Sequence, residues 1–169
     1  MMIPDSGATD TRSLITDKVA KSYAAAARDL AWELSESGQR LKLEVISPSM
    51  LPILRPGDKI VVQNTGAESL EIGDVVIALR KGEFITHRLV GLGSKEYYTK
   101  GDNARYLDPP VKKESILGKV IAIEREDNII DLQSPGWKLA NRILGHYHAF
   151  SGSMFRLLRQ VRIRLRPNP

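Results

Sequence analysis

Hydrophobic and polar positions along this chain follow two different periods, one after the other. Over residues 13–38 apolar residues recur every three or four positions, which predicts one amphipathic helix. The apolar stripe of this helix consists of Ile15, Val19, Tyr23, Ala26, Leu30 and Leu34. Gly38 can end the helix. The preceding residues 1–12 are polar, contain Pro and Gly, and are expected to be disordered.

After Gly38 the period changes to two, which is typical of β-strands with one buried face. Short alternating runs are separated by turn sequences such as Pro-Gly-Asp and Lys-Gly. The predicted strands span residues 41–46, 59–64, 74–80, 83–92, 97–100, 117–126 and 128–132. Because the links have hairpin length, we expect a mainly β domain over residues 39–135, built as an antiparallel sheet or barrel.

Residues 136–169 form a basic tail with a helical period. The tail predicts two short amphipathic helices, separated by the Ser-Gly-Ser sequence at 151–153. Residues 137–169 contain seven Lys or Arg and no Asp or Glu, whereas the net charge of the whole chain is +5. The sequence does not decide whether this tail packs on its own domain or contacts an anionic membrane surface. Nucleic acid is not expected, because no nucleic-acid-binding motif accompanies the charge.

Composition restricts the chemistry and the location that we expect. The chain has no cysteine, which excludes disulfides, thiolate catalysis and Cys-ligated zinc. We find no pattern for a metal site or a phosphate-binding loop, so no cofactor is expected. No stretch reaches the ~18 apolar residues of a membrane span, and the N-terminus lacks a secretory signal pattern. We therefore expect a cytoplasmic protein, with peripheral attachment to the cytoplasmic membrane face as the alternative for the basic tail.

Ser49 is a candidate nucleophile, because it lies between two prolines that restrict the local backbone. A serine becomes a good nucleophile only when a base takes its proton. His87, within the strand predicted at 83–92, is the candidate base, since imidazole exchanges protons near neutral pH. The alternative is a structural strand histidine. His146 and His148, in the tail, are expected to be exposed.

A carboxylate that orients the imidazole would complete a serine–histidine–acid arrangement. Asp102 lies in the turn Lys100-Gly101-Asp102-Asn103, and Asp108 follows six residues later. Gly-Asp-Asn by itself is typical of an ordinary turn. The residues alone do not decide between the two aspartates, so both remain candidates.

Several sequence motifs follow one another at characteristic intervals across residues 41–133. They are Ser47-Pro48-Ser49-Met50-Leu51-Pro52, Arg55-Pro56-Gly57-Asp58, Gly73-Asp74-Val75-Val76, Thr86-His87-Arg88, Thr99-Lys100-Gly101-Asp102-Asn103 and Gly118-Lys119-Val120. In this order they resemble type I signal peptidase and the wider S24/S26 group of serine peptidases. Bacterial signal peptidases and LexA-type repressors of that group have a lysine at the position of His87. The chain therefore resembles the histidine branch, which includes the endoplasmic-reticulum and archaeal-like enzymes.

The resemblance implies a role for each candidate residue. Ser49 would be the nucleophile and His87 the general base, with Asp102 or Asp108 orienting the imidazole. The Ser49 backbone N–H and the Ser47 hydroxyl would stabilise the oxyanion. The implied substrate is a protein or peptide, such as a precursor or leader peptide, that binds as an extended strand with small residues near the scissile bond.

Two departures from the family pattern keep other functions open. Pro48 stands where the family usually has glycine, which stiffens the loop. Members that cleave exported proteins are anchored by transmembrane helices, and this sequence shows none. One alternative is a LexA-like regulator that cleaves its own linker. The other is a peptide-binding module without turnover, which the intact serine–histidine–aspartate set disfavours.

Overall fold

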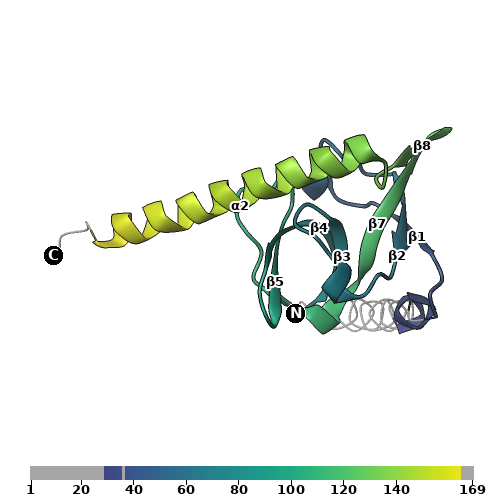
Figure 1. Cartoon of the computed structure of the whole chain (residues 1–169), viewed down its shortest axis with the longest axis horizontal. Helices are drawn as coiled ribbons and strands as arrows, with labels where there is room; N and C mark the ends of the chain where they lie inside the picture. Colours follow the sequence, from purple (N-terminus) through teal and green to yellow (C-terminus); the bar gives the residue numbers. More distant parts are fainter. Residues whose placement is uncertain (1–28, 36, 165–169) are drawn as a thin grey trace, which may run out of the picture.

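The computed structural model describes residues 29–35 and 37–164, and the side chains among them as far as residue 151. The predicted mainly β fold is confirmed, as an eight-stranded antiparallel sheet with a helix near each end (Figure 1). The strands are β1 (Leu41–Glu44), β2 (Lys59–Gln63), β3 (Val75–Arg80), β4 (Glu83–Leu92), β5 (Glu96–Lys100), β6 (Val111–Lys112), β7 (Ile116–Arg125) and β8 (Asn128–Asp131). The predicted disordered segment and most of the helix predicted at 13–38 lie outside the described residues.

The strands follow the order β1-β2-β7-β3-β4-β5-β6, and β8 pairs with β7. Each predicted strand is present, with ends that shift by one or two residues. β6 was not predicted, because two residues are too short to show an alternating period. Short 3₁₀ helices interrupt the loops: η1 (Pro48–Met50), η2 (Ala67–Ser69) and η3 (Lys113–Ser115). The sheet is strongly curved, so that β3, β4 and β5 bend away from the end that carries β1 and β2 (Figure 1).

Two hydrophobic clusters fill the curved sheet. The larger one joins β1, β2 and β7 to residues 29–35, which are helical, and the smaller one lies among β3, β4 and β5. Ala31 belongs to the larger cluster, and Ser35 donates a buried hydrogen bond of 2.7 Å to the carbonyl of Leu117 in β7. The described part of the N-terminal helix is therefore packed on the β domain.

The C-terminal helix α2 runs without interruption over Pro135–Arg164. The prediction of two helices separated at 151–153 was wrong. A glycine inside a helix costs only about 1 kcal/mol relative to alanine, which the neighbouring turns can compensate. The Ser151 hydroxyl donates to the His148 carbonyl at 3.1 Å, so it is satisfied within the helix. α2 crosses one side of the sheet and extends well beyond it (Figure 1).

Two glycines bring the backbone of α2 into direct contact with the loop before β3. A Cβ placed on Gly145 would lie 2.6 Å from the Cα of Gly73. Gly73 has a positive φ of 104°, and a Cβ there would lie 2.4 Å from the Asn141 carbonyl oxygen. Any side chain at either position would therefore push the helix away from the domain.

Candidate active site

Ser49 lies in the middle of η1, directly after the first strand of the sheet. The turn is closed by a hydrogen bond from the Leu51 N–H to the Pro48 carbonyl at 3.2 Å. The carbonyl of Ser49 accepts a hydrogen bond of 2.9 Å from the N–H of Asn103. This bond joins η1 to the turn at residues 101–104, which is far away in the sequence.

The Ser49 hydroxyl faces the imidazole of His87 on β4. The distance from Ser49 Oγ to His87 Nε2 is 3.1 Å, and the His87 side chain is only 12% exposed. Ser47 Oγ lies 3.1 Å from Ser49 Oγ on the other side. An imidazole nitrogen at this distance from a hydroxyl is positioned to accept its proton.

Asp108 holds the other nitrogen of the same imidazole. His87 Nδ1 lies 2.5 Å from Asp108 Oδ2, and the same oxygen accepts a hydrogen bond of 2.8 Å from Thr99 Oγ1. Arg80 donates to the second oxygen at 3.1 Å. Burial opposes ionisation of Asp108, but the hydrogen bonds from His87, Thr99 and Arg80 outweigh it and lower the pKa of this carboxyl below its ordinary value.

Asp102 directs its carboxylate to Arg88 instead. Its two oxygens accept hydrogen bonds from Arg88 Nε and Nη2 at 2.8 and 2.7 Å, in a bidentate ion pair. The Arg88 side chain is fully buried and also donates from Nη1 to the Gly73 carbonyl and to Asn141 of α2, at 2.7 and 2.9 Å. The two candidate aspartates thus have different partners, Asp108 the imidazole and Asp102 a guanidinium.

His148 lies beside the buried polar residues around Arg88, which is not where we predicted it. It was expected to be exposed, but it is buried, at 7% exposure, whereas His146 is exposed as predicted. Lys100 Nζ donates to His148 Nδ1 at 3.0 Å, and His148 Nε2 lies 3.4 Å from Asp102 Oδ1. Burial and the nearby Lys100 charge lower the pKa of His148, and burial likewise lowers the pKa of Lys100. The period of an unbroken α2 would have indicated this, because positions 141, 145 and 148 share one helix face.

Gly101 lies between the Ser49–His87 pair and the Arg88–Asp102 ion pair. A Cβ on this residue would lie 2.7 Å from the Ser49 carbonyl oxygen and 3.1 Å from His87 Nε2. The next residue, Asp102, belongs to the Arg88 ion pair. The turn at 101–103 therefore contacts both the Arg88 ion pair and the Ser49–His87 pair.

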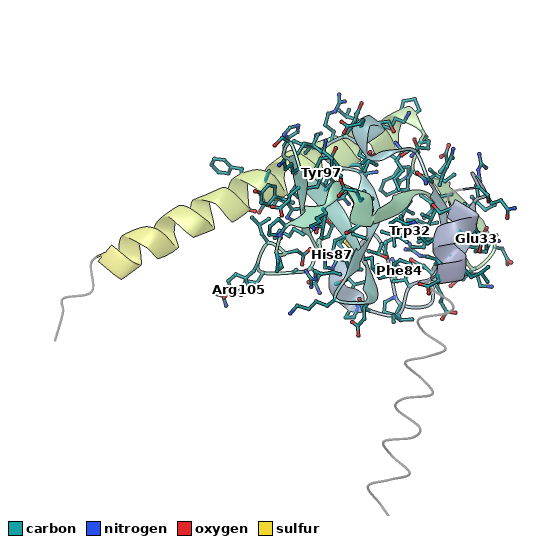
Figure 2. The ribbon with its side chains drawn as sticks, turned by 90° about the horizontal axis from the view of Figure 1, so that it is seen from below. Trp32, Glu33, Phe84, His87, Tyr97 and Arg105 are labelled. Carbon is teal, nitrogen blue, oxygen red and sulfur yellow. The ribbon has the colours of Figure 1, made fainter. Side chains whose placement is uncertain are left out.

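A cavity of about 390 Å³ opens beside the Ser49–His87 pair. Residues of β1, η1 and β4 line it, and most are apolar. Leu43, Val45, Met50, Leu54, Phe84 and Ile85 belong to this lining. Phe84 and Trp32 of the helical segment both pack on the larger core cluster, and Figure 2 labels them near one another. The cavity also borders β1, which has a pairing partner on one side only among the described strands.

The family model described as Peptidase S24-like matches residues 11–121, well over half of the chain. This range contains Ser49, His87, Asp102 and Asp108. The chain belongs to the S24-like peptidase family. Membership supports a function as a serine peptidase or as a LexA-like self-cleaving protein. A search of curated proteins found no match.

The S24-like match ends within β7, so β8 and α2 lie outside it. Asn141 and His148, which contact Arg88 and Lys100, are therefore additions to the matched region. Within the described residues, no three His, Asp or Glu side chains are arranged to hold a metal ion. None of the helices in that same part of the chain has the length and apolar character needed to cross a bilayer.

Proposed function

We propose that this S24-like chain is a serine endopeptidase in which Ser49 attacks the carbonyl carbon of a peptide bond. The supporting observation is the continuous series of contacts from Ser49 Oγ to His87 Nε2 and from His87 Nδ1 to Asp108, at 3.1 and 2.5 Å. A serine, an imidazole and a carboxylate in this order supply a nucleophile, a base and a group that orients the base.

In the first half of the reaction, Ser49 Oγ bonds to the carbonyl carbon while His87 Nε2 takes the hydroxyl proton. Asp108 keeps the other proton on Nδ1, so Nε2 is free to accept, and it stabilises the imidazolium that forms. The proton then moves to the leaving amine as the C–N bond breaks, which leaves an ester on Ser49. Water, deprotonated by the same imidazole, hydrolyses that ester and restores the hydroxyl.

The oxyanion formed during attack needs hydrogen-bond donors. We assign this role to the Ser49 N–H in the first turn of η1 and to the Ser47 hydroxyl, which lies 3.1 Å from the nucleophilic oxygen. One such donor lowers the barrier by roughly 3 kcal/mol in related chemistry. The substrate would lie extended along β1, whose outer edge has no partner among the described strands and offers backbone hydrogen bonds, with apolar side chains entering the cavity beside it.

Self-cleavage is the second candidate function, because the matched region begins at residue 11 and so includes the segment before β1. A scissile bond in that segment would make the chain its own substrate. Purified protein would then become shorter at one site before residue 41, at a rate independent of protein concentration.

N-terminal proteomics of the native host distinguishes these functions. Cells with wild-type protein are compared with cells carrying Ser49→Ala or His87→Ala, and with the matched control Ser94→Ala, whose serine is exposed. N-termini that are present in the wild type and in Ser94→Ala, but absent in Ser49→Ala and in His87→Ala, identify a peptidase and its substrates. If the chain's own N-terminus alone changes, the protein cleaves itself. Identical profiles from all strains, with folded protein present, would overturn both proposals.

A further inference from the structure

α2 carries a row of large apolar side chains that face away from the β domain. Leu139, Ile143, Tyr147 and Phe150 are 60–68% exposed. Their spacing of four, four and three residues places them on one face of the helix. The opposite face is the docked one, where Asn141, Gly145 and His148 are buried. We call the four exposed residues the α2 stripe.

The sequence continues the same pattern beyond the last described side chain. The α2 backbone is helical as far as Arg164, and positions 154, 157, 158 and 161 hold Met, Leu, Leu and Val. These positions have the helical register of the α2 stripe. Arg156, Arg159 and Arg162 fall on other faces of the same helix by that register. An apolar stripe bordered by arginines is the pattern of a helix that lies in a membrane interface.

We propose that the α2 stripe binds the surface of a bilayer that contains anionic lipids. The seven positive charges of residues 137–169, without any acidic residue, match a negative lipid surface. The apolar stripe would enter the boundary between headgroups and acyl chains, where Tyr and Phe are favoured. The inference concerns α2 alone and does not depend on the peptidase proposal.

A second copy of the chain is a poorer occupant of the same face. Pairing two α2 helices through their stripes would bring two basic segments together. Helix pairs of this kind depend on opposite charges beside the apolar seam, and residues 137–169 offer only positive ones. An anionic membrane removes this repulsion, because it supplies the negative charge.

Vesicle flotation with the full-length protein tests the proposal. The probes are vesicles of phosphatidylcholine alone and of phosphatidylcholine mixed with phosphatidylglycerol. We expect wild-type protein to float with the anionic vesicles, at least about tenfold more than with the neutral ones, and to lose binding at about 1 M salt, where charges are screened within about 3 Å. Ser49→Ala should float like the wild type.

Point substitutions are preferable to deletion of α2, because deletion would also remove Asn141 and His148 from the buried polar residues around Arg88. The test variant is Ile143→Glu with Tyr147→Glu, and both side chains are exposed, so the fold should persist. The matched control is Ile129→Glu on β8, an apolar residue 74% exposed outside the stripe. Thermal unfolding by circular dichroism checks that all variants fold.

We expect the double variant to bind anionic vesicles about tenfold or more weakly than the wild type, and Ile129→Glu to bind normally. Absence of wild-type binding at low salt would overturn the proposal, as would full binding by the double variant. A dimer in sedimentation experiments that Ile143→Glu dissociates would instead assign the α2 stripe to a second copy.

Discussion

At the scale of single residues, Asp102 and Asp108 show how the same side chain is given two different environments. His87 and Arg88 are neighbours on β4, and neighbouring strand residues point to opposite faces of a sheet. His87 therefore meets Asp108 and Ser49 on one face, whereas Arg88 meets Asp102 on the face covered by α2. Replacing Asp108 should consequently affect activity, whereas replacing Asp102 should affect stability.

Asp108→Asn should abolish most activity while the protein remains folded. The amide cannot stabilise the imidazolium, and it can hold the ring in the wrong tautomer. We expect the cleavage rate to fall by about 10²–10⁴-fold. The rate is measured on a substrate or on self-cleavage, with the exposed Asp127→Asn as control. An unchanged rate in Asp108→Asn would remove this residue from the mechanism.

Asp102→Ala should act on stability first. It leaves the fully buried guanidinium of Arg88 without its carboxylate, and breaking a buried ion pair in this way typically costs about 3–5 kcal/mol. We expect a decrease of that size in the free energy of unfolding, measured in urea. Asp102→Ala combined with Arg88→Met, which removes both charges and keeps the volume of the arginine side chain, should cost less. Equal losses in the two variants would mean that the charge itself is unimportant.

The sequence named four candidate site residues but did not predict which of them contact one another. The motifs contain Ser49, His87 and Asp102, Asp108 follows six residues after Asp102, and the family resemblance implied their roles. The pairing depends on strand register, because Arg88 lies opposite Lys100 of β5 and so shares its face. Arg80, which donates to Asp108, lies outside every motif, and the motif that contains Thr99 gave no indication of its contact with Asp108.

At the scale of elements, α2 is attached to the domain by backbone proximity and by polar side chains together. Gly145 rests on Gly73, while Asn141 and His148 reach the buried Arg88 and Lys100. The strands were predictable because a period of two is visible over four or more residues. The attachment of α2 could not be predicted, because a glycine within a helical pattern only weakly indicates a break, and the sequence does not show that Gly145 contacts Gly73.

Gly145→Ala should destabilise the docked helix, although alanine favours helices. Its Cβ would approach the backbone of Gly73 to 2.6 Å, and backbone atoms cannot rotate away. Overpacking typically costs about 1–3 kcal/mol, against a gain of about 1 kcal/mol in helix propensity. Gly136→Ala is the matched control, because it lies in the first turn of α2 with nothing within 4 Å. Chemical unfolding should show the loss in the first variant alone.

At the scale of the whole molecule, the buried titratable groups make stability depend on pH. Burial and Lys100 lower the pKa of His148, so the unfolded chain binds a proton at a higher pH than the folded chain does. Stability therefore rises with pH within the window between the folded pKa and the ordinary value of 6.5, and it is lost as the pH falls through that window. Asp102 and Arg88 also face this imidazole and act in opposite directions, with burial dominant.

We expect the free energy of unfolding to decrease as the pH is lowered below 6.5, by at most about 1.4 kcal/mol per pH unit for this one group. In His148→Gln this slope should be smaller. A further decrease should appear below the ordinary carboxyl value of 3.8, where Asp58 and Asp108 with their lowered pKa values finally protonate. Urea unfolding across this pH range measures both slopes, and equal slopes near pH 6 in wild type and variant would contradict the role of His148.

Because α2 lies late in the sequence, the contacts that it makes form late in synthesis. Ser49 and His87 leave the ribosome early, and Asp108 follows them. Asn141 and His148, which enclose Arg88 and the Asp102 turn beside the nucleophile, emerge much later. During translation the nascent chain therefore contains Ser49 and His87 before it contains the residues of α2 that hold the turn at 101–103. The contacts that fix this turn are therefore complete only once residue 148 has been synthesised.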